Sequence, residues 1–183
     1  NKFGTGTSQW YMTSVSVPGI AGANDVSMGS NMGCATLSGG TVKCWGSAQY
    51  AWLGDGNDKL TGKSSLPLTV SGISNATDIV AGYNHSCALI SGGSVKCWGS
   101  NSNGTLGDGT TTMRTSPVSV SGLSGVSELA AGSDFTCARL SDGTAKCWGL
   151  ASNGRLGNDN DTTNQLTPVS VSGLTVASQI SAK

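Results

Sequence analysis

The sequence predicts an all-β protein, a β-propeller of four-stranded blades, and three observations carry this prediction. A unit of about fifty residues recurs along the 183-residue chain. Within each unit, short segments alternate apolar and polar residues as half-buried strands do. A pair of cysteines followed by Trp-Gly occurs three times, 53 and then 50 residues apart. A period of this length with four strands is typical of a propeller blade, which must stack on neighbouring blades to bury both its faces.

The repeats divide a single partial propeller, residues 1–183, into whole and incomplete blades. Whole blades are expected at 21–73, 74–123 and 124–174, with the end of a truncated blade at 1–20 and the start of the next blade at 175–183. This is about three and a half blades, whereas closed propellers have typically 4–8. We therefore expect the arc to be completed by other blades of the same longer chain or by further copies.

Glycine and proline mark the first and last strands of each blade. A short first strand is expected to end at Gly29, Gly82 and Gly132. The last strand is expected to begin at Pro67, Pro117 and Pro168, because proline is tolerated at the first position of a strand. Apolar residues at alternate strand positions are expected to form the core between blades. In the middle blade these are Ile79, Leu89, Val95, Trp98, Val118 and Val120.

The cysteine motif predicts the two middle strands of each blade as a hairpin closed by a disulfide. The cysteines flank Ser-Gly-Gly or Ser-Asp-Gly, which suits a three-residue loop with a type I turn and a last residue at positive φ. Counting outward from such a loop places the two cysteines opposite each other, within reach of a cross-strand disulfide. The predicted pairs are Cys34–Cys44, Cys87–Cys97 and Cys137–Cys147.

Zinc is the alternative role for these cysteines. Zinc ligands usually stand two to four residues apart with further Cys or His nearby, and the nine-residue spacing around a turn does not match that pattern. The favoured disulfides predict an oxidising setting, extracellular or at the cell surface.

The charge composition and the short apolar runs argue against a nucleic-acid partner and against membrane insertion. The ten basic and ten acidic residues cancel, and charged residues make up only 11% of the chain. A nucleic-acid surface needs clustered Lys and Arg, so no nucleic-acid partner is expected. Apolar runs are too short for a membrane span, so no membrane insertion is expected.

Four motifs of the middle unit resemble the regulator of chromosome condensation repeat. They are Gly82-Tyr-Asn-His-Ser-Cys-Ala-Leu89, Gly93-Ser-Val-Lys-Cys-Trp-Gly99, Asn103-Gly-Thr-Leu-Gly-Asp-Gly109 and Ser116-Pro-Val-Ser-Val120. The secreted bacterial version with paired cysteines is the most similar. The resemblance implies a seven-bladed propeller. Its members include a nucleotide exchange factor and a β-lactamase inhibitor, but their functional residues lie in variable loops that nothing here matches. The kelch repeat has a similar period, but its double glycine is replaced by Asp142-Gly143 in the third unit.

Catalysis is not predicted. The single histidine, His85, aligns with Met32 and Phe135 of the other units, which indicates a shared structural position. Ser86 and Cys87 are neighbours on one strand and so point to opposite faces. We therefore assign no catalytic residue and expect the protein not to be an enzyme.

Two acidic loops raise the question of calcium. The segments 55–58 and 158–161 contain Asp and Asn, whose hard oxygen donors suit calcium. The same residues are ordinary turn formers, and the bidentate glutamate of an EF-hand is absent. The turn interpretation is favoured, so no metal site and no cofactor are assigned.

Aromatic residues outside the repeated core are the candidates for binding a partner. They are Trp10, Tyr11, Tyr50, Trp52 and Tyr83, each at a position that is polar or variable in the other units. Exposed aromatics are frequent hot spots for proteins and sugars. The alternative is that these side chains cover a blade edge or pack on a loop.

Two functions remain open. The favoured one is a non-enzymatic extracellular or cell-surface repeat module that binds a protein or glycan through its loops. The alternative is a structural unit of an extracellular fibre or a long adhesin, in which the blades space or assemble the molecule.

Overall fold

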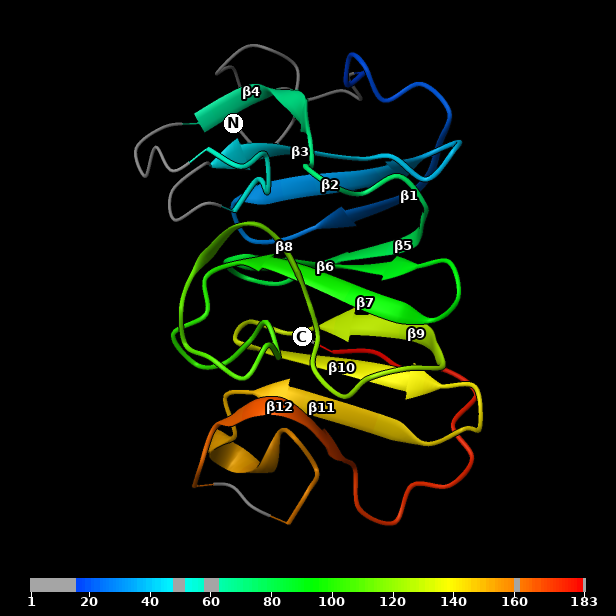
Figure 1. The fold of residues 1–183 in the computed structure, drawn as a ribbon, viewed down its shortest axis with the longest axis vertical. Helices are drawn as coiled ribbons and strands as arrows, with labels where there is room; N and C mark the ends of the chain where they lie inside the picture. The colour runs from blue at the N-terminus through cyan, green and yellow to red at the C-terminus, as the bar shows by residue number, and fades with distance from the viewer. Residues whose placement is uncertain (1–15, 48–51, 58–62, 160–161, 183) are drawn as a thin grey trace.

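The computed structural model describes residues 16–47, 52–57, 63–159 and 162–182. They form three four-stranded antiparallel sheets, stacked one on the next (Figure 1). The first sheet contains β1 (Ala23–Met28), β2 (Met32–Leu37), β3 (Val42–Ser47) and β4 (Lys63–Thr69). The second contains β5 (Ala76–Ala81), β6 (His85–Ile90), β7 (Ser94–Gly99) and β8 (Arg114–Ser119). The third contains β9 (Val126–Ala131), β10 (Phe135–Leu140), β11 (Ala145–Gly149) and β12 (Gln165–Ser170).

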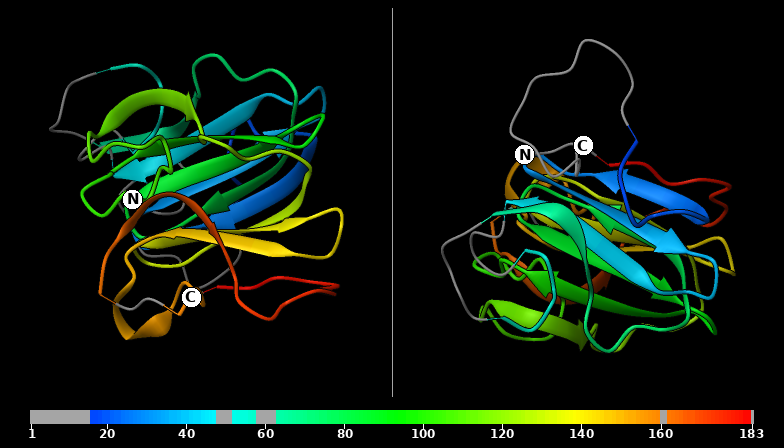
Figure 2. Two further views of the ribbon diagram at one scale, coloured as in Figure 1. Left: turned by 60° about the horizontal axis from the view of Figure 1, so that its bottom comes forward. Right: turned by 90° about the horizontal axis from the view of Figure 1, so that it is seen from above.

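Each sheet is one propeller blade, and its spatial order is the order of the chain. Within the described residues the only helix is a 3₁₀ turn, Ser152–Gly154. The sheets are twisted, and β5 packs against β1 and β2 as β9 packs against β5 and β6 (Figure 2). The prediction of an all-β partial propeller is therefore confirmed. No helix in the described part of the chain is both long and apolar enough to cross a membrane.

The hairpins have the register that the sequence predicts. Cys34 faces Cys44, Cys87 faces Cys97 and Cys137 faces Cys147. In each pair the two Cα atoms are 4.1 Å apart and the sulfurs are bonded. The described residues contain no free cysteine.

The predicted turn type is wrong for two of the three hairpins. Gly39 and Gly92 follow the serine of the loop and have φ of 91° and 95°. A positive φ at that position is the mark of a type II turn, which glycine permits. In the third hairpin Asp142 stands there instead and is not at positive φ, so only this loop fits the predicted type I turn.

The predicted start of the last strand is also wrong. The outer strands begin at Lys63, Arg114 and Gln165, three or four residues before the prolines. Each proline thus lies within a strand. It is tolerated there because β4, β8 and β12 are edge strands, where one side of the backbone needs no partner.

The core lies between the blades. Trp98 and Ile79 belong to the cluster between the first and second blades, while Leu89, Val95 and Val120 belong to the cluster between the second and third. Val118 is half-buried at the edge of the second cluster. Trp45, Trp98 and Trp148 are the largest fully buried side chains, as expected for residues at the same place in each blade.

Equivalent positions differ in exposure at the first blade. Ile79 on β5 is 1% exposed because it packs against the first blade, whereas Val26, its equivalent on β1, is 49% exposed. At the other side, residues 175–182 follow the path that the first strands take. The Ala177 N–H donates to the Gly143 carbonyl at 2.8 Å, just as the Ala76 N–H donates to the Gly40 carbonyl at 2.9 Å.

Candidate functional site

The antiparallel blades give the molecule two different faces. The hairpin face carries the tight turns at 38–40, 91–93 and 141–143. The long-loop face carries the turns at 29–31, 82–84 and 132–134, together with the connections from the third to the fourth strand of each blade. The described parts of these connections lie on the left side of Figure 1. Because long loops can vary without disturbing the sheets, the long-loop face is the place to look for a site.

A shallow cavity of about 310 Å³ opens on the long-loop face. It lies where the first strands of all three blades end, and it is lined by residues 28–30, 81–83 and 131–133 and by Ala182. Glycine is needed here for close approach. A Cβ atom on Gly29 would collide with the carbonyl oxygen of Gly82, and one on Gly82 would collide with that of Gly132. The absence of these side chains brings the three strand ends together.

Among the residues that the structure describes, Tyr83 is the one aromatic side chain that lines this cavity. Its backbone N–H donates to the Ser133 carbonyl at 3.2 Å, which fixes the turn against the next blade. The side chain remains 45% exposed. Serine stands at the equivalent positions, Ser30 and Ser133, so the second blade alone presents an aromatic ring here.

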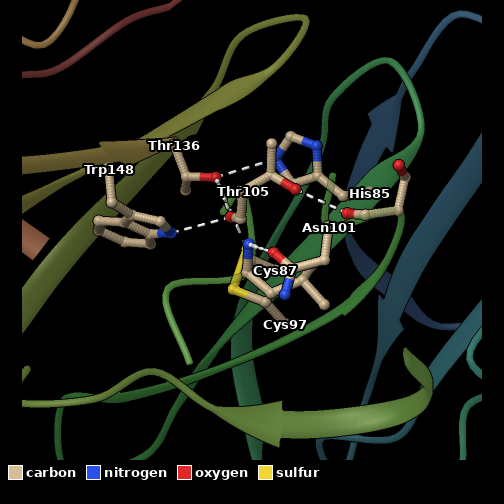
Figure 3. The surroundings of a disulfide bond; sticks show 9 residues. His85, Cys87, Cys97, Asn101, Thr105, Thr136 and Trp148 are labelled. Carbon is tan, nitrogen blue, oxygen red and sulfur yellow. Dashed lines mark hydrogen bonds between the residues drawn. A yellow bond between two sulfur atoms is a disulfide. The ribbon is translucent and has the colours of Figure 1, made fainter. Parts of the chain in front are cut away.

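A buried hydrogen-bond network joins the second and third blades (Figure 3). The Thr136 hydroxyl donates to the Thr105 carbonyl at 3.1 Å, and the same carbonyl accepts from Trp148 Nε1 at 2.9 Å. His85 Nε2 lies 2.8 Å from Thr136 Oγ1. Because the hydroxyl proton is already donated to the carbonyl, Nε2 must carry a proton and donate to the hydroxyl oxygen.

Burial lowers the pKa of His85 to about 4, so the ring is neutral at pH 7. His85, Met32 and Phe135 are all buried, in agreement with the predicted structural position. The neighbouring disulfide completes the packing, with Cys87 Sγ 3.9 Å from Thr136 Oγ1. The imidazole therefore holds two blades together and does not face solvent.

Models of a known repeat family match this chain. The regulator of chromosome condensation (RCC1) repeat model matches residues 39–89 and 92–139, and a second model with the same description matches residues 76–105 and 126–155. The chain belongs to the RCC1 repeat family. The predicted resemblance is thus confirmed. Each match of the first model, 39–89 and 92–139, spans the end of one blade and the start of the next.

Similar proteins extend this assignment. The human E3 ubiquitin-protein ligase HERC2 is 32% identical over 114 residues, which are 60% of this chain and 2% of HERC2. The chain thus spans about 2% of the length of the curated relatives it matches. Prp20p from Saccharomyces cerevisiae superposes with a TM-score of 0.73 at 19% identity, covering 84% of this chain and 39% of Prp20p. Human WBSCR16 gives 0.77 at 22% identity, covering 89% and 43%. At these identities the two structures show the fold alone.

The binding prediction for Trp52 is wrong. Its side chain is 3% exposed and packs in the core between the first two RCC1 blades. The reason lies in the backbone: the Trp52 carbonyl accepts from Trp98 Nε1 at 3.1 Å, as the Thr105 carbonyl accepts from Trp148. The equivalent Thr105 is also 3% exposed, so this loop position is buried at both junctions. Trp10, Tyr11 and Tyr50 lie outside the described residues, so Tyr83 is the candidate that the structure describes as exposed.

The loop at 55–57 has the contacts of a turn. The Asn57 N–H donates to Asp55 Oδ1 at 3.2 Å, two residues back along the chain. Asp58, Asn160 and Asp161 lie outside the described residues. In the part of the chain that the structure describes, no three His, Cys, Asp or Glu side chains gather as metal ligands.

A row of acidic residues along the first strands was not singled out from the sequence. Asp25, Asp78 and Glu128 occupy equivalent positions on β1, β5 and β9. Each accepts a hydrogen bond from a backbone N–H one blade further on: Ile79 to Asp25 at 3.1 Å, Leu129 to Asp78, and Ile180 to Glu128 at 3.3 Å. Aligning the repeats would have shown an acid in every unit, which is the signal that could have found this row.

Proposed function

We propose that the chain is a non-enzymatic binding module that engages a protein partner through its long-loop face. The observation that carries this proposal is Tyr83, an exposed aromatic at the rim of a cavity built from three blades. Tyrosine is one of the residue types in which protein-binding hot spots are enriched. The blade frame supplies rigidity, and the turn supplies the specific side chain.

Relatives with the same fold support a binding role. The structure of Prp20p is described together with its binding to Gsp1p and histones. A further structure is of yeast RCC1 (Prp20) bound to Kap60. None of these partners is assigned to this chain. They support the narrower point that a propeller of this type works as a surface for other proteins.

The partner is proposed to be extracellular or on a cell surface. All six cysteines are paired in three disulfides, which persist in oxidising compartments and are rare in the cytosol. The chain has no net charge, so the contact would depend on shape and aromatic packing more than on electrostatic steering.

The test is a binding screen of the purified chain against panels of extracellular proteins and of glycans. Tyr83→Ser is compared with Leu66→Ser, which removes a side chain of similar exposure, 50%, from the outer strand β4. We expect a protein ligand whose affinity falls at least tenfold in Tyr83→Ser and is unchanged in Leu66→Ser. Equal affinity of both variants would overturn the site, and ligands found only among the glycans would overturn the protein partner.

The second candidate is a structural unit of an extracellular fibre or adhesin. It is favoured by one observation, the exposure of Val26 and Met28 on β1, where Ile79 and Ala81 of the next blade are buried. This surface has the character of a blade junction, so another blade or another copy would fit it. Sedimentation over a range of concentrations tests this. Self-association that Val26→Asp abolishes would favour the fibre, and a monomer at every concentration would exclude it.

A further inference from the structure

The acidic row contains one pair that differs from the rest. The Ile79 N–H donates to two carboxylates at once, Asp25 Oδ2 at 3.1 Å and Asp78 Oδ1 at 2.8 Å. The two carboxyl groups are also close enough to hydrogen-bond to each other. A hydrogen bond between two carboxyl groups needs a proton on one of them. This pair bridges the first strands of the first and second blades.

Glu128, at the equivalent place in the third blade, has a different environment. Arg139 lies directly opposite it on β10, and Arg139 Nε is 2.9 Å from Glu128 Oε2. The positions that correspond to Arg139 are Leu89, opposite Asp78, and Thr36, opposite Asp25. No ion pair reaches either aspartate within the described residues. The third blade neutralises its acid with a guanidinium, and the first two blades have no such group.

We propose that Asp25 and Asp78 are a proton-sharing pair that ties the first two blades together when protonated and weakens their junction when both are ionised. One proton lets one carboxyl group donate to the other. Loss of that proton leaves two negative charges that share the Ile79 N–H, while the Val26 N–H donates to Asp25 alone and the Leu129 N–H to Asp78 alone. The pair is thus a pH-sensitive device in the blade frame, and it is independent of the proposed binding function.

The environment of the pair determines the direction of the effect. Burial, the hydrogen bond with Asp25 and repulsion by Asp25 together raise the pKa of Asp78 to about 6. From β9, the Leu129 N–H opposes this rise, and Glu128 is paired with Arg139. From β6, the residue opposite is the uncharged Leu89, and His85 lies at the other end of that strand.

Because the folded pKa lies above the ordinary value of 3.8, the protonated pair contributes stability at low pH. That contribution is lost as the pH rises from about 4 through about 6. Two pKa units correspond to about a hundredfold change in the folding equilibrium constant. Asp78 is partly exposed, and solvent screening reduces the expected change to about tenfold.

The test is a pH titration of the whole chain with two readouts. Carboxyl carbon NMR should show Asp78 titrating near pH 6. Thermal unfolding is compared between the wild type and Asp78→Asn, because both keep the opposing pH dependence of His85. From pH 4.5 to 7.5 the folding equilibrium constant of the wild type should fall about tenfold relative to that of Asp78→Asn, whose amide remains neutral and can still donate. Asp25→Asn should show a smaller loss than the wild type, because it removes the hydrogen bond and the repulsion of Asp25 but leaves the burial of Asp78. Asp134→Asn, which changes an aspartate in the turn between β9 and β10, is the matched control and should keep the wild-type profile.

Salt separates the pair from a merely structural role. At pH 7.5, raising the salt concentration should stabilise the wild type more than Asp78→Asn, because screening weakens the repulsion of the two carboxylates. Titration of Asp78 near pH 4 would overturn the proposal. So would an Asp78→Asn variant that folds but retains the pH dependence of the wild type. If Asp78→Asn does not fold, the NMR titration and Asp25→Asn decide.

Discussion

The two junctions between blades use the same positions with different chemistry. In the first junction, between the first and second blades, the Ser86 hydroxyl lies beside sulfur atoms, 4.0 Å from Met32 Sδ and 3.6 Å from Cys34 Sγ. In the second junction, between the second and third blades, His85 and Thr136 replace Met32 and Ser86 and form a hydrogen-bond network. Both junctions keep the bond from a tryptophan Nε1 to a backbone carbonyl.

This comparison distinguishes the contacts that stabilise the stacked blades from the side chains that can differ between junctions. The tryptophan bonds end on backbone atoms, so they do not depend on which side chain the loop carries. The side chains beside them need only fill the space and satisfy their own polar groups. A buried titratable group could therefore enter the second junction without altering the blade. A surface position can vary in the same way: Tyr83 stands where the equivalent turns have Ser30 and Ser133.

The largest expected effect is the loss of a frame residue. Trp98→Ala should destabilise the protein by roughly 3–5 kcal/mol, because it empties a fully buried site and removes the bond to the Trp52 carbonyl. Trp52→Ala should be nearly as severe, since that side chain is also in the core. Tyr83→Ala should stay within about 0.5 kcal/mol, as surface substitutions do. Chemical denaturation measures all three, and a mild Trp52→Ala would contradict the buried placement.

The disulfides should have the next largest effect. Replacing Cys87 and Cys97 together with alanine should cost roughly 2.5–3 kcal/mol, the chain-entropy estimate for so short a loop. The same replacement of Cys137 and Cys147 should cost a similar amount, because their hairpin has the same length. Alkylation before and after reduction should reveal six thiols only in the reduced chain. A peptide map showing pairs between blades would contradict the assignment.

The third effect is a difference in pH response between the junctions. The pKa of His85 is lowered by burial to about 4, below its ordinary 6.5, so the neutral ring contributes stability above pH 6.5. This contribution should be lost as the pH falls toward 4, by an amount of the order of 2–3 kcal/mol.

Asp78 gives the stability a pH dependence of the opposite sign over the same pH range. The contribution of His85 is therefore measured as the difference in unfolding free energy between the wild type and His85→Met. His85→Met copies the first junction and should abolish the loss at acid pH. Thermal unfolding at pH 4.5 and 7 measures it. If the wild type and His85→Met differed in stability by the same amount at pH 4.5 and at pH 7, a neutral, buried His85 would be contradicted.

The smallest effect compares the two hydroxyls. Thr136→Val removes the acceptor for His85 and leaves a buried donor without its partner, which should cost about 1–3 kcal/mol. Ser86→Ala removes only weak contacts to sulfur and should cost less than 1 kcal/mol. Unfolding free energies at pH 7 check this order. Equal costs would mean that the second network adds no stability beyond packing.

The repeat frame was predictable from sequence because its signals are local. The disulfide pairs followed from counting outward from a turn, and in a hairpin the register depends only on the loop. The buried tryptophans followed from their recurrence at one position. The start of the last strand did not follow, because proline is also tolerated within an edge strand, and only the assembled sheet shows which strand is at the edge.

The candidate site was predictable in part. Tyr83 departed from the repeat and proved exposed, but Trp52 departed in the same way and is buried. Sequence could not separate them, because Trp52 packs with Trp98 of the next blade, a contact that exists only when the two blades stack. The Asp25–Asp78 pair was missed for a similar reason. Its members are 53 residues apart and meet only when two blades stack.

The central claim is that the specific function lies in the exposed departure from the repeat at Tyr83. The most direct test places a photo-crosslinking amino acid at position 83 and, as the control, at position 66 on the outer strand. A ligand from the binding screen should crosslink from position 83 and not from position 66. Crosslinking only from position 66, or equally from both, would contradict the claim that the long-loop face is the binding surface.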